Sequence, residues 1–161
     1  MKYVEALLKN KMYLETLTQI KEVEKERFFC KHDFSHLLDV CRIAYIMNLE
    51  NELGMDKEMI YLSGLLHDIG RGQEYANGIS HEKAGVEIAT IILEQIQCPK
   101  DLMHAVLTEI SGHRTKPQDW NLVTRESLFY LADKKARNCF MCAANKDCNW
   151  SEDKKTKTIV Y

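Results

Sequence analysis

Apolar residues recur at spacings of three and four along most of the chain, and no stretch alternates apolar and polar residues as a half-buried strand does. The clearest example is residues 33–50, where Phe34, Leu37, Cys41 and Ala44 share one face and only a narrow polar stripe remains. A helix that is apolar around most of its circumference is typical of the centre of a bundle. We therefore predict an all-α fold, a helical bundle in a single domain.

The same spacing predicts further helices on either side of this one. They cover 57–69, 81–97, 100–112 and 125–138, with one or two more within 2–27. Asp56 and Ser80 are suited to cap two of them. The turn residues between Arg71 and Ile79 predict a loop. The charged run 21–27 predicts a solvated segment, and we expect the N-terminal helices to pack outside the core without taking part in chemistry.

A His67-Asp68 doublet stands at the end of the apolar stretch that begins near Met59. Both residue types are ordinary metal ligands, but adjacent residues of a helix point about 100° apart. The two side chains can serve one site only where the helix ends, and we expect Gly70 and Gly72 to permit the bend. The alternative is a helix end with an exposed histidine and a solvated aspartate.

Four more candidate ligands lie at helix ends or on inward-facing rows, namely His36, His81, His113 and Asp133. Each has a structural alternative, such as a core histidine bonded to a carbonyl or, for Asp133, a surface ion pair with Arg137. Together with the doublet they place six candidates on five successive helices, which indicates a metal site inside a bundle. Imidazole and carboxylate suit zinc, manganese, iron, cobalt or nickel. We expect His32 to be a surface or capping residue.

Composition and charge narrow the classes of function. The 161 residues are 45% hydrophobic with two prolines, which fits one folded domain. A formal net charge of −2 without a basic stripe gives no reason to expect a nucleic-acid partner. No apolar run approaches the roughly 20 residues of a membrane span. Six cysteines without a secretory signal favour a reducing, cytoplasmic location.

Three cysteines follow the last expected helix, as Cys139, Cys142 and Cys148. Three thiolates are one ligand short of a structural zinc site. A fourth ligand would be Cys30, a histidine or a residue of a partner chain. The alternative is a set of reduced thiols in an irregular C-terminal cap, so a structural metal here is one of two open interpretations.

The order His36 … His67-Asp68 … Asp133 resembles the HD superfamily of metal-dependent phosphohydrolases over about residues 30–138. The matching pieces are Lys31-His32-Asp33-Phe34-Ser35-His36, Leu65-Leu66-His67-Asp68-Ile69-Gly70-Arg71 and Leu131-Ala132-Asp133-Lys134. The resemblance implies an HD-domain-like bundle in which His36, His67, Asp68 and Asp133 bind a metal. It also implies that His81 and His113 add a second metal and that Asp68 bridges the two.

Two departures from the superfamily restrict these expectations. Arg114, rather than a second histidine, follows His113, which argues against a third metal, and the Gly-Tyr-Pro signature of the cyclic-di-GMP phosphodiesterase branch is absent. The division that we expect is an N-terminal helical segment (1–28), an HD-type metal-binding domain (29–138) and a cysteine-containing cap and tail (139–161).

The expected activity is hydrolysis of a phosphoester in a nucleotide or small phosphorylated metabolite, with two divalent metals activating water. We expect Asp68 and Arg71 to be catalytic, and Arg71, Lys83 and Arg114 to bind the substrate phosphate. The expected partner is this small substrate, and a homo-oligomer is compatible with the sequence. The alternatives are a di-iron oxygenase of HD type and a non-catalytic module that binds metal or nucleotide.

Overall fold

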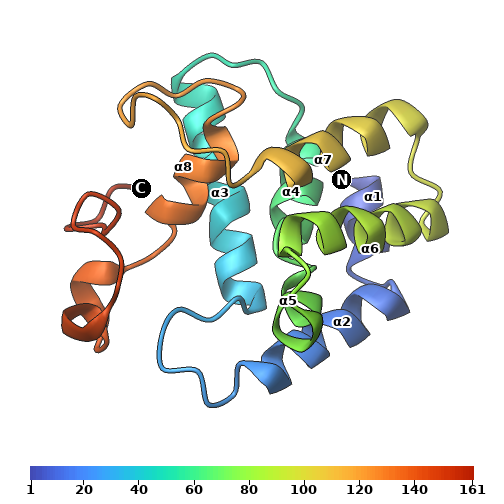
Figure 1. The fold of residues 1–161 in the computed structure, drawn as a ribbon. Helices are drawn as coiled ribbons and strands as arrows, with labels where there is room; N and C mark the ends of the chain where they lie inside the picture. The colour runs from blue at the N-terminus through green and yellow to red at the C-terminus, as the bar shows by residue number, and fades with distance from the viewer.

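The structure is a computed structural model that describes residues 1–161 and consists of helices joined by loops, without strands (Figure 1). In chain order the elements are α1 (Lys2–Leu7), α2 (Lys11–Val23), α3 (Phe34–Glu50), α4 (Lys57–Leu66), α5 (Arg71–Asn77), α6 (His81–Gln95), α7 (Lys100–Gly112), α8 (Leu128–Lys135) and the short 3₁₀ turns η1 (Cys139–Met141) and η2 (Asn145–Asp147). The predicted all-α, single-domain fold is confirmed. None of the helices is long and apolar enough to cross a membrane.

Helix α3 lies at the centre, packed against α4 and α8, while α4 also contacts α7, and α7 contacts α6 (Figure 1). Its buried face includes Leu37, Val40 and Ala44, as its apolar pattern predicts. The approach to α4 is close, because a Cβ on Gly64 would lie 2.5 Å from the Sγ atom of Cys41. Glycine at this position therefore lets the two central helices share one contiguous core.

Side-chain caps fix where several helices begin. Asp33 and Asp56 accept hydrogen bonds from the amides of His36 and Met59, at 3.0 and 2.9 Å. The Asp56 cap is confirmed, whereas Ser80 precedes α6 without a side-chain bond. Because Asp33 holds the first turn of α3, it also fixes the backbone that carries His36.

Two expectations about the secondary structure are wrong. Residues 71–77 form helix α5 rather than a loop, and Gly78 ends it with φ = +69°. No residue of α5 is buried, so the helix has no apolar row that a periodicity argument could detect. The last helix covers only Leu128–Lys135 instead of 125–138, because Thr124 and Ser127 bond to each other in a turn ahead of it.

The C-terminal segment, residues 139–161, extends to one side of the bundle (red in Figure 1). It contains η1, η2 and irregular chain, and only Cys139 and Ala144 are buried within it. This segment therefore has almost no apolar core of its own.

Candidate metal centre

The His67-Asp68 doublet lies where α4 ends. His67 is the C-terminal capping residue of α4, and the amide of Arg71 bonds to the carbonyl of Asp68 at 3.0 Å, so the chain turns tightly here. Gly70 lies in this turn with an ordinary φ of −81°, and a Cβ there would lie 2.5 Å from the amide nitrogen of Gly85 and overlap the carbonyl of His81. The glycine is thus required by the close approach of α6, which brings His81 to the doublet, and not by unusual dihedral angles.

The six candidate ligands come together in two groups that share Asp68. One group comprises His36, His67, Asp68 and Asp133, and the other comprises Asp68, His81 and His113; within each group the ligand atoms all lie within 4.8 Å of one another. Every one of these residues is buried. The helices α3, α4, α6, α7 and α8 therefore each bring at least one of these side chains, at or beside one of their ends, to a common centre.

Asp68 presents a different oxygen to each group. Its Oδ2 atom lies 3.0 Å from Nε2 of His67, and its Oδ1 atom lies 3.3 Å from Nε2 of His81. In the first group, Nε2 of His36 lies 3.2 Å from Oδ1 of Asp133. A carboxylate with its two oxygens facing two ligand groups has the arrangement that a bridging ligand needs.

Acceptors outside the centre orient three of the four candidate histidines, while Nδ1 of His36 has no hydrogen-bond partner. Nδ1 of His67 donates to the carbonyl of Gly64 at 2.8 Å, Nδ1 of His113 donates to that of Ile110 at 2.6 Å, and Nδ1 of His81 donates to Glu74 at 2.9 Å. In a neutral ring the proton on Nδ1 leaves Nε2 as a lone-pair donor, which is how second-shell partners orient metal-binding histidines.

Two observations indicate that a cation fits between these nitrogens. Nε2 of His67 is buried without a hydrogen-bond partner. Nε2 of His81 and Nε2 of His113 face each other at 3.1 Å, although both rings already use Nδ1 as the donor. Two lone pairs at this distance repel unless a positive charge lies nearby, so the residues present suit a bound divalent metal.

The protonation states of four of these residues are also those of metal ligands, whereas Asp68 raises the pKa of His67 although burial alone would lower it. Burial lowers the pKa of His36 and that of His113 to about 4, which keeps both rings neutral near pH 7. Burial by itself would raise the pKa of Asp68 and of Asp133, but His67 beside the first and His36 beside the second hold both pKa values well below the usual range. Neutral imidazoles with ionised carboxylates are the forms that bind metal.

A fifth histidine, His32, lies at the centre, and the expectation that it is a surface or capping residue is wrong. It is 6% exposed, and its Nε2 atom lies 3.8 Å from Oδ2 of Asp68. His32 precedes the capping residue Asp33 and lies outside α3, so no helical spacing in the sequence places it at the centre.

Glu24 holds His32 in place, so the expectation of a solvated run 21–27 is wrong at this residue, while the other six residues of the run are exposed as expected. Glu24 is 2% exposed and accepts from the backbone amide of His32 at 2.7 Å, from its Nδ1 atom at 2.5 Å and from the hydroxyl of Tyr75 at 2.6 Å. Burial would raise the Glu24 pKa, but the hydrogen bonds with His32 help to lower it to about 2. No periodic pattern distinguishes this glutamate from its charged neighbours.

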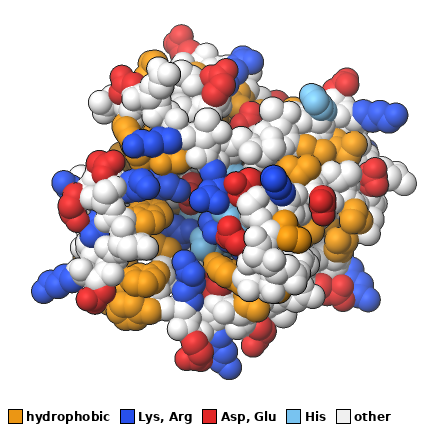
Figure 2. All heavy atoms as spheres, viewed as in Figure 1, with side chains coloured by type: hydrophobic (Ala, Val, Ile, Leu, Met, Phe, Trp, Pro, Cys, Tyr) orange, Lys and Arg blue, Asp and Glu red, His pale blue; other side chains and the backbone are white.

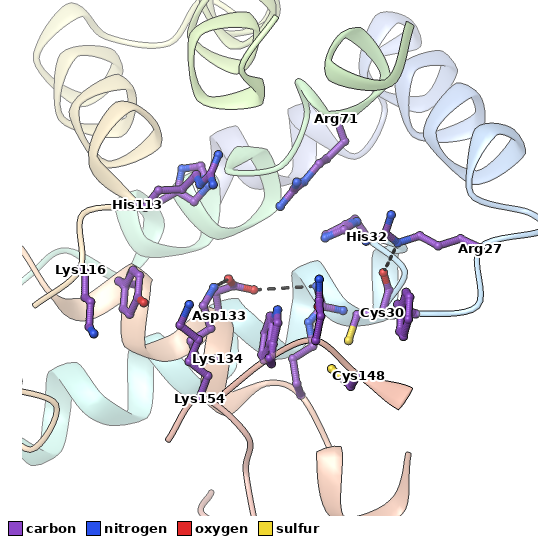
Figure 3. A pocket seen from close by; sticks show the side chains of 16 residues that line it. Arg27, Cys30, His32, Arg71, His113, Lys116, Asp133, Lys134, Cys148 and Lys154 are labelled. Atoms are coloured by element: carbon purple, nitrogen blue, oxygen red, sulfur yellow. Dashed lines mark hydrogen bonds and ion pairs between the residues drawn. The ribbon is translucent and has the colours of Figure 1, made fainter. Parts of the chain in front are cut away.

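A cavity of about 620 Å³ opens beside the centre, and positive side chains dominate its lining. Figure 2 shows Lys and Arg side chains gathered around this hollow, and in Figure 3 Arg71, His113 and Asp133 point toward a common space. The cations that line it are Arg27, Arg71, Arg114, Lys116, Lys134, Arg137 and Lys154, and Asp133 is its one carboxylate.

The three expected phosphate-binding residues are placed differently. Arg71 lines the cavity, and Asp68 and Glu74 hold its Nε and Nη1 atoms at 2.9 and 2.8 Å, which leaves Nη2 free. Arg114 also lines it, 55% exposed and 3.4 Å from Glu82. Lys83 is exposed on α6 and does not reach the cavity.

The cavity also has cations and aromatic rings that the expected phosphate-binding set lacks. Nη2 of Arg137 lies 2.9 Å from Nε2 of His36, so Arg137 reaches the centre itself. The ammonium of Lys134 lies 5.0 and 5.1 Å from the ring centres of Tyr130 and Trp150 and bonds to Asp133. Sequence spacing does reveal that Lys134 and Arg137 flank Asp133, but Trp150 reaches the cavity only through the irregular C-terminal segment.

Comparison with known proteins gives one family. The HD domain model matches residues 33–144. An uncharacterized protein of Clostridium beijerinckii is 39% identical over 155 residues, which cover 96% of each chain. Proteins named Ribonuclease Y also match, at 31% identity over 104 residues in Alkaliphilus metalliredigens and 44% over 54 residues in Aquifex aeolicus, where the match spans 20% and 10% of their length.

A crystal structure of a predicted HD superfamily hydrolase from an uncultured Thermotogales bacterium has the same fold. The TM-score is 0.54 at 22% identity, covering 88% of this chain and 80% of the other. The family model covers most of the chain, including His36, His67, Asp68 and Asp133. The buried histidines and aspartates described above could hold a metal, as the resemblance implies. This chain belongs to the HD domain family.

Proposed function

We propose that this protein is a metal-dependent phosphohydrolase that cleaves a phosphoester of a nucleotide or small phosphorylated metabolite. The observation that carries the proposal is the position of Asp68, shared by two ligand groups whose members Asp133 and His113 line a cavity with seven cations. His36, His67, Asp68 and Asp133 would hold one divalent metal, and Asp68, His81 and His113 a second. Iron, manganese, zinc, cobalt and nickel all suit such ligands.

The metals would supply an activated water and polarise the phosphoryl oxygens. The protein's own groups bind and orient the substrate. Arg71 is held by Asp68 and Glu74, so its free Nη2 atom is fixed in direction and available to a phosphoryl oxygen. Asp68 accepts from Arg71 through Oδ1 and remains ionised, which keeps the carboxylate available to both groups.

The lining of the cavity supports a substrate larger than inorganic phosphate. Arg27, Arg114 and Lys134 surround the space with positive charge, which favours several phosphate oxygens. Tyr130, Trp150 and Phe29 add aromatic rings, which suit a nucleobase or another flat group. This lining favours hydrolysis of a phosphorylated substrate over oxygenation of a neutral one.

The test is to remove metal from the purified chain, restore each candidate metal separately, and measure hydrolysis of nucleotides, aryl phosphate mono- and diesters and a short RNA. The RNA is included because relatives named Ribonuclease Y match part of the chain. We expect metal-dependent, oxygen-independent hydrolysis that falls roughly a thousandfold in Asp68→Asn, well beyond the 10–100-fold typical of an outer-shell change. Asp39→Asn, a half-buried carboxylate on α3 that lies outside the cavity, is the matched control.

Three outcomes would contradict the proposal. If Asp68→Asn were as active as the control, the shared carboxylate would have no role in the reaction. Turnover that requires oxygen would favour the oxygenase alternative. Tight nucleotide binding without turnover with any of the metals would favour the binding module.

A further inference from the structure

Four of the six cysteines line one small cavity beside the C-terminal segment. This cavity, of about 100 Å³, is bordered by Cys30 from the loop between α2 and α3 and by Cys139, Cys142 and Cys148 from the segment after α8. All four are free thiols. In Figure 3 the sulfur atoms of Cys30 and Cys148 lie close to each other, although 117 positions separate them in the sequence. No histidine lines the cavity, so Cys30 completes a set of four possible ligands.

Tight turns bring the three later cysteines to the cavity. The amide of Cys142 bonds to the carbonyl of Cys139 at 3.2 Å across η1, and Cys148 follows directly after η2. Asn145 joins the two turns, since its side-chain amide donates to the carbonyl of Cys139 at 2.6 Å and its backbone amide donates to that of Cys142 at 3.1 Å. Paired cysteines in short turns are the usual ligand source of structural zinc sites.

The segment that carries these cysteines lacks the apolar burial that would hold it in place. Among residues 139–161 only Cys139 and Ala144 are buried. A bound metal would add stability that this segment does not gain from apolar burial. Four thiols from two distant parts of the chain are positioned to bind such a metal.

The charges around the cavity suit a metal bound by four thiolates. Four thiolates on a divalent ion leave a net charge of −2, and Arg137 and Lys155 both line the cavity. Arg137 is held by the carbonyl of Lys31 at 2.7 Å and Lys155 by that of Asn145 at 3.0 Å.

We propose that Cys30, Cys139, Cys142 and Cys148 bind a structural zinc ion that fastens the C-terminal segment to the loop between α2 and α3. No three of the four sulfur atoms lie within 4.8 Å of one another, whereas the His/Asp ligand atoms do so within each group. Tetrahedral zinc places them about 3.8 Å apart, so binding draws the four side chains inward around the cavity.

This zinc site also supports the wall of the phosphate cavity. Cys30, Arg137 and Cys148 line both cavities, and Trp150 and Lys154 reach the larger one from the same segment. The zinc site therefore has a positioning role for the cavity. That consequence rests on the proposed function, whereas the zinc site itself does not.

The test uses the full chain purified without a metal-binding tag, with elemental analysis and X-ray absorption at the zinc edge. We expect about one zinc per chain with only sulfur neighbours, which distinguishes this site from the His/Asp centre. In Cys30→Ser and Cys148→Ser the sulfur-bound zinc should fall below about a tenth of an equivalent, since three ligands make an incomplete site. Cys98→Ser, a half-buried cysteine in the turn between α6 and α7, is the control and should retain it.

A second readout protects the test against variants that fail to fold. Cobalt added to the metal-free wild-type chain should give the visible and near-ultraviolet bands of a tetrahedral tetrathiolate site, and limited proteolysis of the metal-free chain should remove residues 139–161 before the helices. Sulfur-bound zinc that persists in Cys30→Ser, an iron–sulfur absorption spectrum, or a disulfide among the four cysteines would each overturn the proposal. All of these readouts are independent of hydrolysis, so they stand even where the proposed function fails.

Discussion

The His/Asp centre and the cysteine cluster (Cys30, Cys139, Cys142 and Cys148) are assembled in opposite ways. The ligands of the centre come from helices, are buried, and converge within 4.8 Å without any ion. The cysteines lie in loops and short turns, Cys142 is exposed, and no three of their sulfur atoms lie within 4.8 Å of one another. Helix packing thus forms the centre in advance, whereas the cysteine cluster depends on an ion to complete it.

This difference separates two uses of a metal. A preformed centre on rigid elements keeps its ligands oriented for chemistry, which is what catalysis requires. A loosely formed cluster gains order when the ion binds, so its binding free energy stabilises the fold. Substitutions in the two regions should therefore have different effects on the protein.

The largest expected effect is on the packing that forms the centre. In Gly70→Ala the new Cβ overlaps the carbonyl of His81, so α6 must move away from the doublet. We expect a loss of about 3 kcal/mol in the free energy of unfolding, measured by urea denaturation, together with loss of metal from the centre. Gly112→Ala, where a Cβ has nothing within 4 Å, should change stability by less than about 1 kcal/mol. Equal effects of the two substitutions would show that close packing does not form the centre.

The next effect concerns chemistry at a centre that stays folded. Arg71→Ala removes the guanidinium held between Asp68 and Glu74, and we expect kcat/KM to fall about a hundredfold, or about 2.7 kcal/mol. Arg71→Lys should recover only part of this, because lysine cannot make two directed contacts while facing a phosphate. Steady-state kinetics with the identified substrate is the measurement. Lys83→Ala on the exposed face of α6 should leave kcat/KM unchanged, and an equal loss there would contradict the assignment to Arg71.

The smallest effect is a pH dependence within the helical bundle. Burial, with a contribution from Glu126, raises the pKa of Glu109 on α7 to about 7. Because this pKa lies above the unfolded value of about 4.5, the free energy of unfolding decreases as the pH rises from about 4.5 to 7. Glu109→Gln should therefore stabilise the protein at pH 8 by about 1 kcal/mol, after allowance for solvent screening, and by almost nothing at pH 5.

Thermal unfolding at the two pH values measures this difference, and Glu87→Gln on the exposed face of α6 is the control. An equal gain for Glu109→Gln at both pH values would contradict it. Acidification should have the opposite effect on the cysteine cluster, whose thiolates lose metal as they are protonated.

The sequence predicts the helices with buried rows and the side chains they carry. The apolar pattern around α3, α4, α6 and α7 is strong enough to place His36, His67, His81 and His113 facing inward. It fails for α5, which buries nothing, and for Glu24, whose burial depends on His32 and Tyr75 folding over it. These features arise from contacts between distant elements, which local periodicity does not record.

The same limit applies around the cavity. Arg71 is predictable because it follows the doublet directly, whereas Arg27 and Trp150 reach the cavity from segments without a periodic pattern. Cys30 is an open alternative in the sequence, and only the folded chain brings it to the other three cysteines. The sequence identifies residues that can be ligands, and the tertiary structure determines which of them lie close together.

The lining of the large cavity also has a consequence for encounter rates. Seven cations and one carboxylate give it a formal charge of +6, while the whole chain carries −2, so the rest of the molecule carries −8. An anion near this opening is attracted by the positive lining, while the rest of the chain is net negative. Steering of this kind speeds association at low ionic strength and fades as salt screens the field over about 8–10 Å. The uneven charge thus makes the speed of substrate capture sensitive to the ionic strength of the surrounding solution.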